Sequence, residues 1–466
     1  PEGWVARASS SSRASSVVEG SPGPRVLEPG EVARWTFIVE VPPEAEPSKL
    51  YYLEQPREGE LYRWPSSREL WGESRNPELI QAVLQMRIGS WTPVEHRAPA
   101  RYRGVDKATG EFVRPVLVVP ALSVRMDPSV MAWPLGSGEV REVSVTVRTA
   151  SAQPRSGTVG LELPEGWRAQ PASHAFTLST PGEETSVVFR VSVPPDVEEG
   201  RYRLEARART DDGREYREGF ALVDYPHIPR GILFADAATR VSAFQVAVPD
   251  DTRVGYVMGS GDDGPEAIRQ MGLEVDLLQP GDVRAGAFDP YEVIVLGIRA
   301  YETRPELVAA NDRLLAYARE GGTVIVQYNK YEFPRGGFAP FPVEMSRPHD
   351  RVADETVPVR ILDPEHPLFN RPNVIGPRDF QGWAQERGLY FLRSWDERYQ
   401  PLLEMADPGE EPKRGGLLVA PLGDGLYVYT GLAFFRQFPE GVPGAYRLFA
   451  NLLALRAGEL ERGESR

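Results

Sequence analysis

The chain has 466 residues, a formal net charge of -14, five histidines and no cysteine. This length suffices for three domains of ordinary size, and the absence of cysteine excludes disulfides, thiolate metal sites and a cysteine nucleophile. Acidic residues spread along the chain disfavour nucleic acid and anionic membranes as partners, and no run of eighteen apolar residues predicts a membrane span.

The first part of the chain carries a signature that returns later. Residues 1–4 and 164–167 both read Pro-Glu-Gly-Trp, and Pro-Gly-Glu follows at residues 29–31 and 181–183. Five residues further on, each copy continues through Phe, Val and Val to Pro-Pro, beginning at Phe37 and at Phe189. The spacing predicts two copies of one β-module, at residues 1–123 and 124–225.

The two copies differ in what precedes the signature. About forty residues of alternating strand pattern come before the second Pro-Glu-Gly-Trp, whereas the first opens the sequence. We therefore expect the first module to lack its front strands, as in a processed carboxy-terminal piece of a longer protein.

Strand patterns fill both modules. Residues 34–41 alternate strand-favouring and polar side chains, and residues 106–111 form a predicted hairpin turn that residues 211–215 match in the second copy. In the second module, residues 143–147, 160–163, 187–193 and 202–208 alternate in the same way. The pattern predicts two tandem immunoglobulin-like sandwiches, the first incomplete at its N-terminus and the second with seven strands.

The period changes after a linker at residues 225–229, and residues 226–460 read as an α/β domain. Strands are expected at residues 254–258, 274–278, 292–296 and 323–327, and helices at 265–271, 307–319 and 445–455. Unbroken apolar strands alternating with helices indicate a parallel sheet covered on both faces.

A glycine-rich turn at residues 259–264 follows the first of these strands. Asp262 and Asp263 stand where a phosphate would bind, so helix capping is favoured over nucleotide binding. His366 lies in an Asp-Pro-Glu-His-Pro turn and is expected to be structural. No zinc-ligand spacing occurs, so we expect no metal or other cofactor in this chain.

Aromatic, amide and arginine side chains gather at or beyond the predicted strand ends, where open α/β sheets bind ligands. Such side chains suit a sugar, although Trp383 could instead be core and Arg387 and Arg436 could form buried ion pairs. The candidate ligand-binding residues are Arg299, Tyr301, Gln327, Asn329, Trp383, Gln385, Arg387 and Arg436.

Two resemblances follow from these motifs. The Pro-Glu-Gly-Trp and Pro-Gly-Glu signatures resemble the NEW3-type sandwich found beside catalytic domains of carbohydrate-active proteins. The strand and helix order after residue 253 resembles the flavodoxin-like, class I glutamine amidotransferase-like fold, whose nucleophile would fall near residues 327–329. Neither a cysteine nor a Gly-x-Ser-x-Gly elbow is present, which implies a domain without its nucleophile.

Residues 379–391 and 434–451 resemble the carboxy-terminal half of large bacterial PIG-L (LmbE-like) family deacetylases. That resemblance implies an upstream zinc-dependent de-N-acetylase domain and an extracellular or periplasmic location. The zinc motif has no counterpart here, so no catalytic residue or metal ligand is assigned to this chain.

Two functions therefore remain open. The chain could be the non-catalytic accessory region of a sugar de-N-acetylase, binding a glycan or serving as a scaffold. Alternatively, it is a structural or assembly protein whose sandwich edges pair with copies of itself, with other chains or with the cleaved deacetylase portion. An amidase with an unrecognised hydroxyl nucleophile is the least favoured hypothesis.

Overall fold

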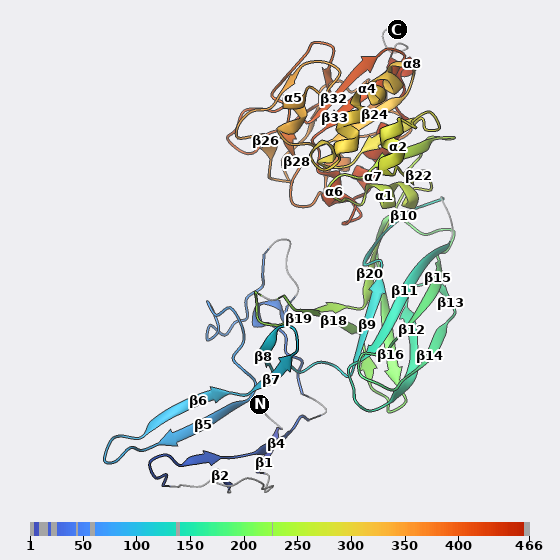
Figure 1. The fold of residues 1–466 in the computed structure, drawn as a ribbon. Coiled ribbons are helices and arrows are strands. Elements are labelled where there is room, and N and C mark those ends of the chain that lie inside the picture. The colour runs from blue at the N-terminus through green and yellow to red at the C-terminus, as the bar shows by residue number, and fades with distance from the viewer. Residues whose placement is uncertain are drawn as a thin grey trace.

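The computed structural model describes residues 4–8, 17–19, 26–42, 45–55, 61–136, 140–225 and 227–460. The described chain is rich in strands and has few helices, and it forms three successive regions (Figure 1). They are N-terminal ribbons, a β-sandwich, and a carboxy-terminal domain built on one large sheet. Within these residues no helix is both long and apolar enough to pass through a bilayer.

The described strands before Leu122 pair two by two. β1 (Val5–Ala8) pairs with β4 (Phe37–Glu40), β2 (Val17–Glu19) with β3 (Val32–Arg34), β5 (Gln81–Met86) with β6 (Val94–Pro99), and β7 (Arg101–Asp106) with β8 (Gly110–Pro115). The region also holds a short 3-10 helix, η1 (Tyr51–Leu53). The hairpin turn expected at residues 106–111 is present, because Asp106 pairs with Gly110.

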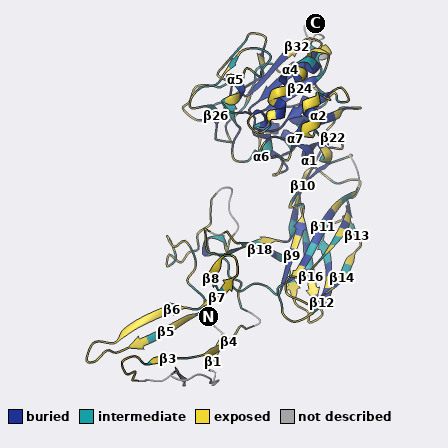
Figure 2. Ribbon diagram, in the orientation of Figure 1, coloured by how far each residue is buried: buried dark blue, intermediate teal, exposed yellow. Residues whose placement is uncertain are grey.

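These ribbons do not form the sandwich expected for residues 1–123. Among the described residues of this region, Tyr51 is the one buried apolar side chain, at 2% exposure. Most of the ribbon surface is exposed (Figure 2). A two-stranded ribbon cannot bury an apolar face by itself, so a sandwich would need further strands packed against it.

The repeat is nevertheless real at the level of strand register. Val5 follows Trp4 and pairs with Glu40, just as Arg168 follows Trp167 and pairs with Ser192. These pairs belong to β1–β4 and to β13 (Arg168–Gln170) with β15 (Glu184–Ser192).

The turn that precedes the repeated strand is also the same in both copies. Gly30 and Gly182 both adopt a left-handed backbone, with φ of 85° and 89°. In each copy the glutamate after the glycine closes the turn, Glu31 N donating to Glu28 O and Glu183 N to Thr180 O at 2.9 and 3.0 Å. The described residues of the first copy therefore share this strand pair and this turn with the complete module.

The sandwich consists of two antiparallel-rich sheets. One has the order β10-β20-β16-β12-β14 with β17 beside β16, and the other the order β13-β15-β11-β9. Their further bounds are β9 (Leu122–Asp127), β10 (Val130–Pro134), β11 (Val140–Thr149), β12 (Arg155–Glu162), β14 (Ser173–Leu178), β16 (Gly200–Thr210), β17 (Glu215–Tyr216) and β20 (Ala238–Phe244). Alternate residues of β11, Val143, Val145 and Val147, are fully buried in the shared core, as the period of a strand requires.

The sandwich extends beyond the expected boundary at residue 225. β20 pairs with β10 in parallel and with β16 antiparallel, and its Val241 and Ala243 are buried in the sandwich core. In the sequence, the hairpin formed by β18 (Glu218–Val223) and β19 (Gly231–Asp236) lies between β16 and β20. The described residues 227–229 thus lie within a hairpin of the sandwich region, and the region built on one large sheet begins after Phe244.

The carboxy-terminal domain contains a seven-stranded sheet of order β22-β21-β23-β24-β33-β32-β30. Its first five strands are mutually parallel, β32 runs antiparallel to β33, and β30 runs antiparallel to β32. The strands are β21 (Arg253–Val257), β22 (Glu274–Leu277), β23 (Val293–Leu296), β24 (Thr323–Gln327), β30 (Gln400–Pro401), β32 (Leu417–Leu422) and β33 (Gly425–Thr430).

Helices cover both faces of this sheet. α1 (Gly264–Gln270) and α7 (Pro443–Ala454) contribute to one buried cluster, whereas α2 (Pro280–Ala285), α3 (Ala300–Thr303) and α4 (Pro305–Arg319) contribute to the other. Every residue of β23, β24 and β33 is buried, which is why these strands read as unbroken apolar runs.

Short elements complete the domain around the sheet. Two-stranded ribbons join β25 (Val343–Glu344) to β29 (Ser394–Trp395), β26 (Asp350–Val352) to β28 (Gly388–Phe391), and β27 (Arg360–Ile361) to β31 (Leu403–Glu404). The remaining helices are α5 (Glu332–Gly336), η2 (Pro367–Phe369), η3 (Pro377–Phe380), α6 (Phe434–Gln437) and α8 (Ala457–Leu460). Because the central strands are parallel, their carboxyl ends meet at one edge of the sheet.

Candidate functional site

The loops after β23 and β24 lie together at the carboxyl edge of the parallel sheet. Arg299 N, three residues beyond Leu296, donates to Tyr328 O at 2.9 Å, which joins the two loops. Arg299 has a left-handed backbone with φ of 60° and stands directly before α3. The strand-to-helix turn with a left-handed residue therefore follows β23. From the sequence alone, the corresponding turn was expected after β24, near residues 327–329.

Five half-buried or buried rings form a cluster at this edge, which we call the aromatic shelf: Tyr328, Tyr331, His349, Tyr390 and Phe435. Tyr390 is at its centre, with ring centroids 3.8 Å from His349 and 5.6 Å from Tyr328, both nearly parallel. Phe435 approaches Tyr328 at 5.4 Å and Tyr331 approaches Tyr390 at 5.9 Å. The shelf combines apolar faces with hydroxyl and imidazole groups.

Backbone conformation is unusual around the shelf. Of the four non-glycine residues with positive φ in the described chain, Arg299, Gln385 and Tyr390 all lie here. Left-handed conformations cost free energy for residues with a side chain and cluster at ligand sites, where the surrounding structure imposes them. The shelf and its flanking loops are thus held in a defined, costly geometry.

Charged side chains flank the shelf on two sides. Arg299 pairs with Glu302, Nε to Oε2 at 2.8 Å, and Lys330 approaches the same carboxylate at 3.3 Å. On the other side, Arg436 Nε pairs with Glu386 Oε1 at 2.7 Å and its guanidinium also donates to Gln385 Oε1. Arg436 and Gln385 keep part of their surface accessible, so they remain able to contact a ligand.

Burial shifts the pKa values of three shelf residues in the direction that favours their uncharged forms. Desolvation raises the pKa of Tyr328 and of Tyr390, and the charge of Arg299 partly opposes it in both cases. Desolvation, with a smaller effect from Arg351, lowers the pKa of His349. Uncharged Tyr328, Tyr390 and His349 are thereby favoured, which suits hydrogen bonding to neutral polar groups.

Three of the candidate residues predicted from the sequence are buried in the protein interior. Tyr301, Gln327 and Asn329 are 4%, 1% and 1% exposed. Asn329 Oδ1 accepts from Tyr301 N at 3.0 Å, and Gln327 Nε2 donates to the Tyr256 hydroxyl at 2.7 Å. Their polar groups fix the loops beneath the shelf and do not face it.

Trp383 and Arg387 are also interior residues, at 4% and 3% exposure. Trp383 Nε1 donates to Asp379 O at 2.9 Å, and Arg387 NH2 donates to Val357 O at 2.7 Å. Desolvation lowers the pKa of Arg387 to about 10, so it remains a cation at neutral pH. Of the two arginines considered for buried ion pairs, Arg436 forms a partly buried pair with Glu386, whereas Arg387 instead binds backbone carbonyls.

The glycine-rich turn after β21 is filled by a side chain of the protein. Asp262 Oδ1 accepts from Gly264 N at 2.9 Å and from the Tyr256 hydroxyl at 2.5 Å, and its Oδ2 accepts from Ile298 N at 3.0 Å. The Asp262 carboxylate thus occupies the amide at the start of α1 that a phosphate would bind, whereas Asp263, the residue before α1, makes no side-chain capping hydrogen bond.

Sequence reasoning found three residues that flank the shelf and missed the rings of the shelf itself. Arg299, Gln385 and Arg436 are brought together, but Tyr328, Tyr390 and Phe435 were seen only as members of longer aromatic blocks, and His349 was not singled out. Alternation and strand ends cannot identify which aromatic residue is buried under its neighbours. The signal that could have helped is the Tyr328-Asn329-Lys330-Tyr331 run directly after a fully apolar strand.

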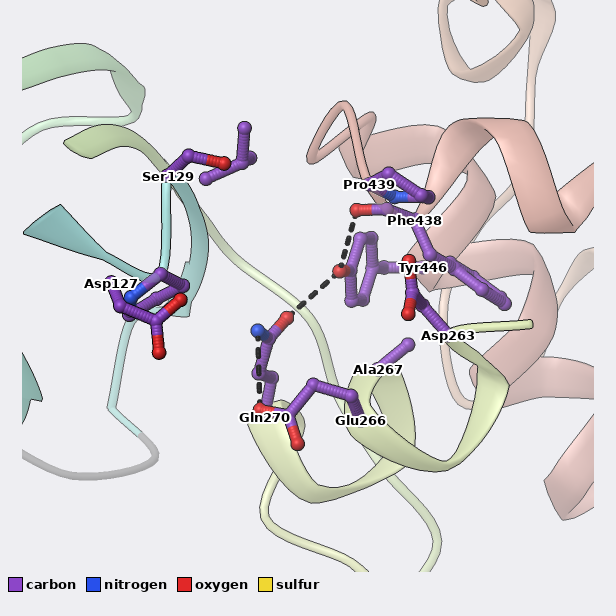
Figure 3. A pocket seen from close by; sticks show the side chains of 11 residues that line it. Asp127, Ser129, Asp263, Glu266, Ala267, Gln270, Phe438, Pro439 and Tyr446 are labelled. Carbon is purple, nitrogen blue, oxygen red and sulfur yellow. Dashed lines mark hydrogen bonds between the residues drawn. The ribbon is translucent and has the colours of Figure 1, made fainter. Parts of the chain in front are cut away.

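A cavity lies between the sandwich and the carboxy-terminal domain (Figure 3). This cavity of about 210 Å³ is lined by the turn around Pro128, by α1 and by Phe438 and Tyr446. The Tyr446 hydroxyl donates to Gln270 Oε1 at 2.9 Å. Asp127, Asp263 and Glu266 give the cavity an acidic rim, but among the described residues no group of three His, Cys, Asp or Glu could hold a metal ion.

Residues 136–211 match the family described as the NPCBM-associated, NEW3 domain of alpha-galactosidase. The matched segment runs from the turn before β11 into the loop after β16, within the sandwich. The NEW3 resemblance of the second module is thereby confirmed. The chain contains a sandwich similar to an accessory domain that accompanies a carbohydrate-active enzyme.

Solved structures resemble parts of the chain only distantly, and no curated protein matches it in sequence. Native alpha-2-macroglobulin from Escherichia coli is 14% identical with a TM-score of 0.18, over 27% of this chain and 17% of that chain. The ASH / PapD-like domain of human CEP192 is 14% identical with a TM-score of 0.17, over 30% of this chain and 97% of that chain. The alignments thus span under a fifth of the macroglobulin but nearly all of the CEP192 domain.

Proposed function

We propose that this chain is a non-catalytic accessory region that binds a glycan beside a carbohydrate-active enzyme, with the aromatic shelf as the glycan site. The observation that carries the proposal is the stack of Tyr328, Tyr390 and His349 between accessible arginine and amide groups. Sugars present apolar C–H faces and rings of hydroxyls, which pair with aromatic faces and planar hydrogen bonders. The NEW3 match of the neighbouring sandwich supports the same class of partner.

We extend the proposal to a PIG-L family parent, in which a separate zinc-dependent domain would remove the N-acetyl group outside the cell or in the periplasm. It is supported by the resemblance of residues 379–391 and 434–451. The strand order β22-β21-β23-β24-β33 supports a flavodoxin-like, amidotransferase-like assignment of the last domain. In that assignment Arg299 stands in the strand-to-helix turn, and its side chain cannot act as a nucleophile because its pair with Glu302 raises its pKa.

Glycan binding is tested by screening the whole chain against immobilised glycans and measuring the best ligand by calorimetry. We expect Arg436→Gln and Tyr390→Ala each to weaken binding about tenfold, which corresponds to about 1.4 kcal/mol. Arg360→Gln is the matched control, because Arg360 is an exposed arginine that pairs with Glu404 away from the shelf. Unchanged affinity in both shelf variants, with unaltered melting temperatures, would remove the shelf as the site.

A second candidate function is assembly with another polypeptide through strand edges. It is favoured by the β1–β4 ribbon, in which Phe37 and Ile38 of β4 are exposed although β4 repeats the sandwich strand β15. Sedimentation of the chain purified from its native source would test it. A complex with a second polypeptide is expected, and a free monomer at native concentrations would contradict this candidate.

A further inference from the structure

In the second, complete module, the repeated strand β15 has a neighbouring strand along each of its two edges. β15 has β13 along one part of its length and β11 along nearly all of it, both antiparallel. Phe189 of β15 pairs with Val143 of β11, and both side chains are fully buried. The strand that buries this edge is therefore one with valine at alternate positions.

The first module has the same strand without that partner. Phe37 of β4 corresponds to Phe189, yet it is 48% exposed where Phe189 is 0% exposed. β4 pairs with β1 in the register of β15 with β13, and no other described strand pairs with β4. Ile38 and Val41 are also more than half exposed, at 57% and 53%. An apolar strand with an open hydrogen-bonding edge is a template for strand addition.

We infer that the open edge of β4 binds an antiparallel strand with the residue pattern of β11, supplied by polypeptide outside residues 1–466. The internal repeat fixes the register. In the sandwich Val143 faces Phe189 and Glu142 faces Arg190, so the added strand places a valine-like residue opposite Phe37 and the residue before it opposite Ile38. This inference rests on the second candidate function, assembly through strand edges. It adds the residue pattern of the strand that binds β4 and the register in which it binds.

A second copy of this chain fits the edge less well. At this edge it would offer another β4, only four residues long, whereas the template partner β11 has ten residues. Self-pairing would also set the two Phe37-bearing edges against each other and leave no β11-like valines at the interface. Self-association through β4 is therefore an outcome that contradicts the inference.

The test uses the whole chain and a synthetic peptide with the sequence of residues 140–149. Since the chain has no cysteine, Ile38→Cys introduces a single thiol. Facing residues of antiparallel strands have Cα atoms about 4.5–5.5 Å apart, within the span of a disulfide. A peptide with cysteine at the Glu142 position is expected to form a disulfide with this variant at least tenfold faster than one with cysteine at the Ser144 position.

Val83→Cys is the control chain, because Val83 is 50% exposed on another two-stranded ribbon that does not belong to the repeat. It should react with both peptides equally and slowly. Equal rates for the two peptides at Ile38→Cys, or a disulfide-linked dimer of that variant in place of the peptide adduct, would overturn the inference. Assembly through some other surface would survive that result, so the two failures are distinguishable.

Discussion

Replacing Asn451 with leucine is expected to lower the free energy of unfolding of the carboxy-terminal domain by about 3–5 kcal/mol. Asn451 lies in α7 and is 0% exposed. Its Oδ1 accepts from Asn373 N at 2.9 Å, and its Nδ2 donates to Leu368 O at 2.7 Å and to Asn373 O at 2.8 Å. Leucine has a similar volume but leaves these buried backbone groups without partners.

Denaturant unfolding of the two proteins, followed by tryptophan fluorescence, measures this loss. Leu452→Met is the matched control, since Leu452 is the next residue of α7, is fully buried and loses no hydrogen bond. A volume-conserving change of this kind costs less than about 1.5 kcal/mol. If Asn451→Leu costs no more than the control, the asparagine does not hold the 368–373 segment against α7.

Acidification is expected to destabilise the same domain through His366. The imidazole is 4% exposed, and its Nδ1 accepts from Leu368 N at 3.1 Å at the start of η2. Desolvation lowers its pKa to about 4, against 6.5 for an exposed histidine. Between these values the unfolded chain binds a proton that the folded chain does not, so stability falls as the pH drops from about 6.5 to about 4. The lost stability is about 3 kcal/mol.

The contribution of His366 is isolated by comparing the pH dependence of unfolding in the wild type and in His366→Asn. Asparagine can still accept the Leu368 N–H at this position but does not titrate. The variant should lose about 3 kcal/mol less than the wild type over the same pH range. Parallel curves for the two proteins would show that His366 is not held neutral by burial.

The aromatic shelf shows how much of a site can be predicted from the residues at the ends of the expected strands. Arg299 and the 327–329 segment were placed correctly at one edge of the sheet, because parallel strands bring their carboxyl ends together. Which side chains face outward was not predictable. Gln327 and Asn329 turn inward to satisfy Tyr256 and Tyr301, while Tyr328 between them joins the shelf.

The residue at which the sandwich ends illustrates a second limit of prediction from sequence, which concerns strand pairing. The stretch at residues 225–229 was predicted to be a linker between domains, but β20, further along the chain, still pairs with β10 and β16 of the sandwich. Sequence pattern identifies strands through their side chains, whereas pairing depends on backbone groups that all residues share. The sequence therefore does not say which strand lies next to which.

The sequence by itself determined the repeat, the left-handed glycines of its turn, the apolar parallel strands and the absence of cysteine chemistry, since each of these depends on residue identity at short spacing. Only the tertiary structure decided that the repeated strand pair of the first copy has no buried core among the described residues, and that the sandwich continues to Phe244. It alone also revealed Tyr390 at the centre of an aromatic shelf. These features depend on contacts between residues far apart in the chain, where burial and pairing are set by the neighbours that the fold supplies.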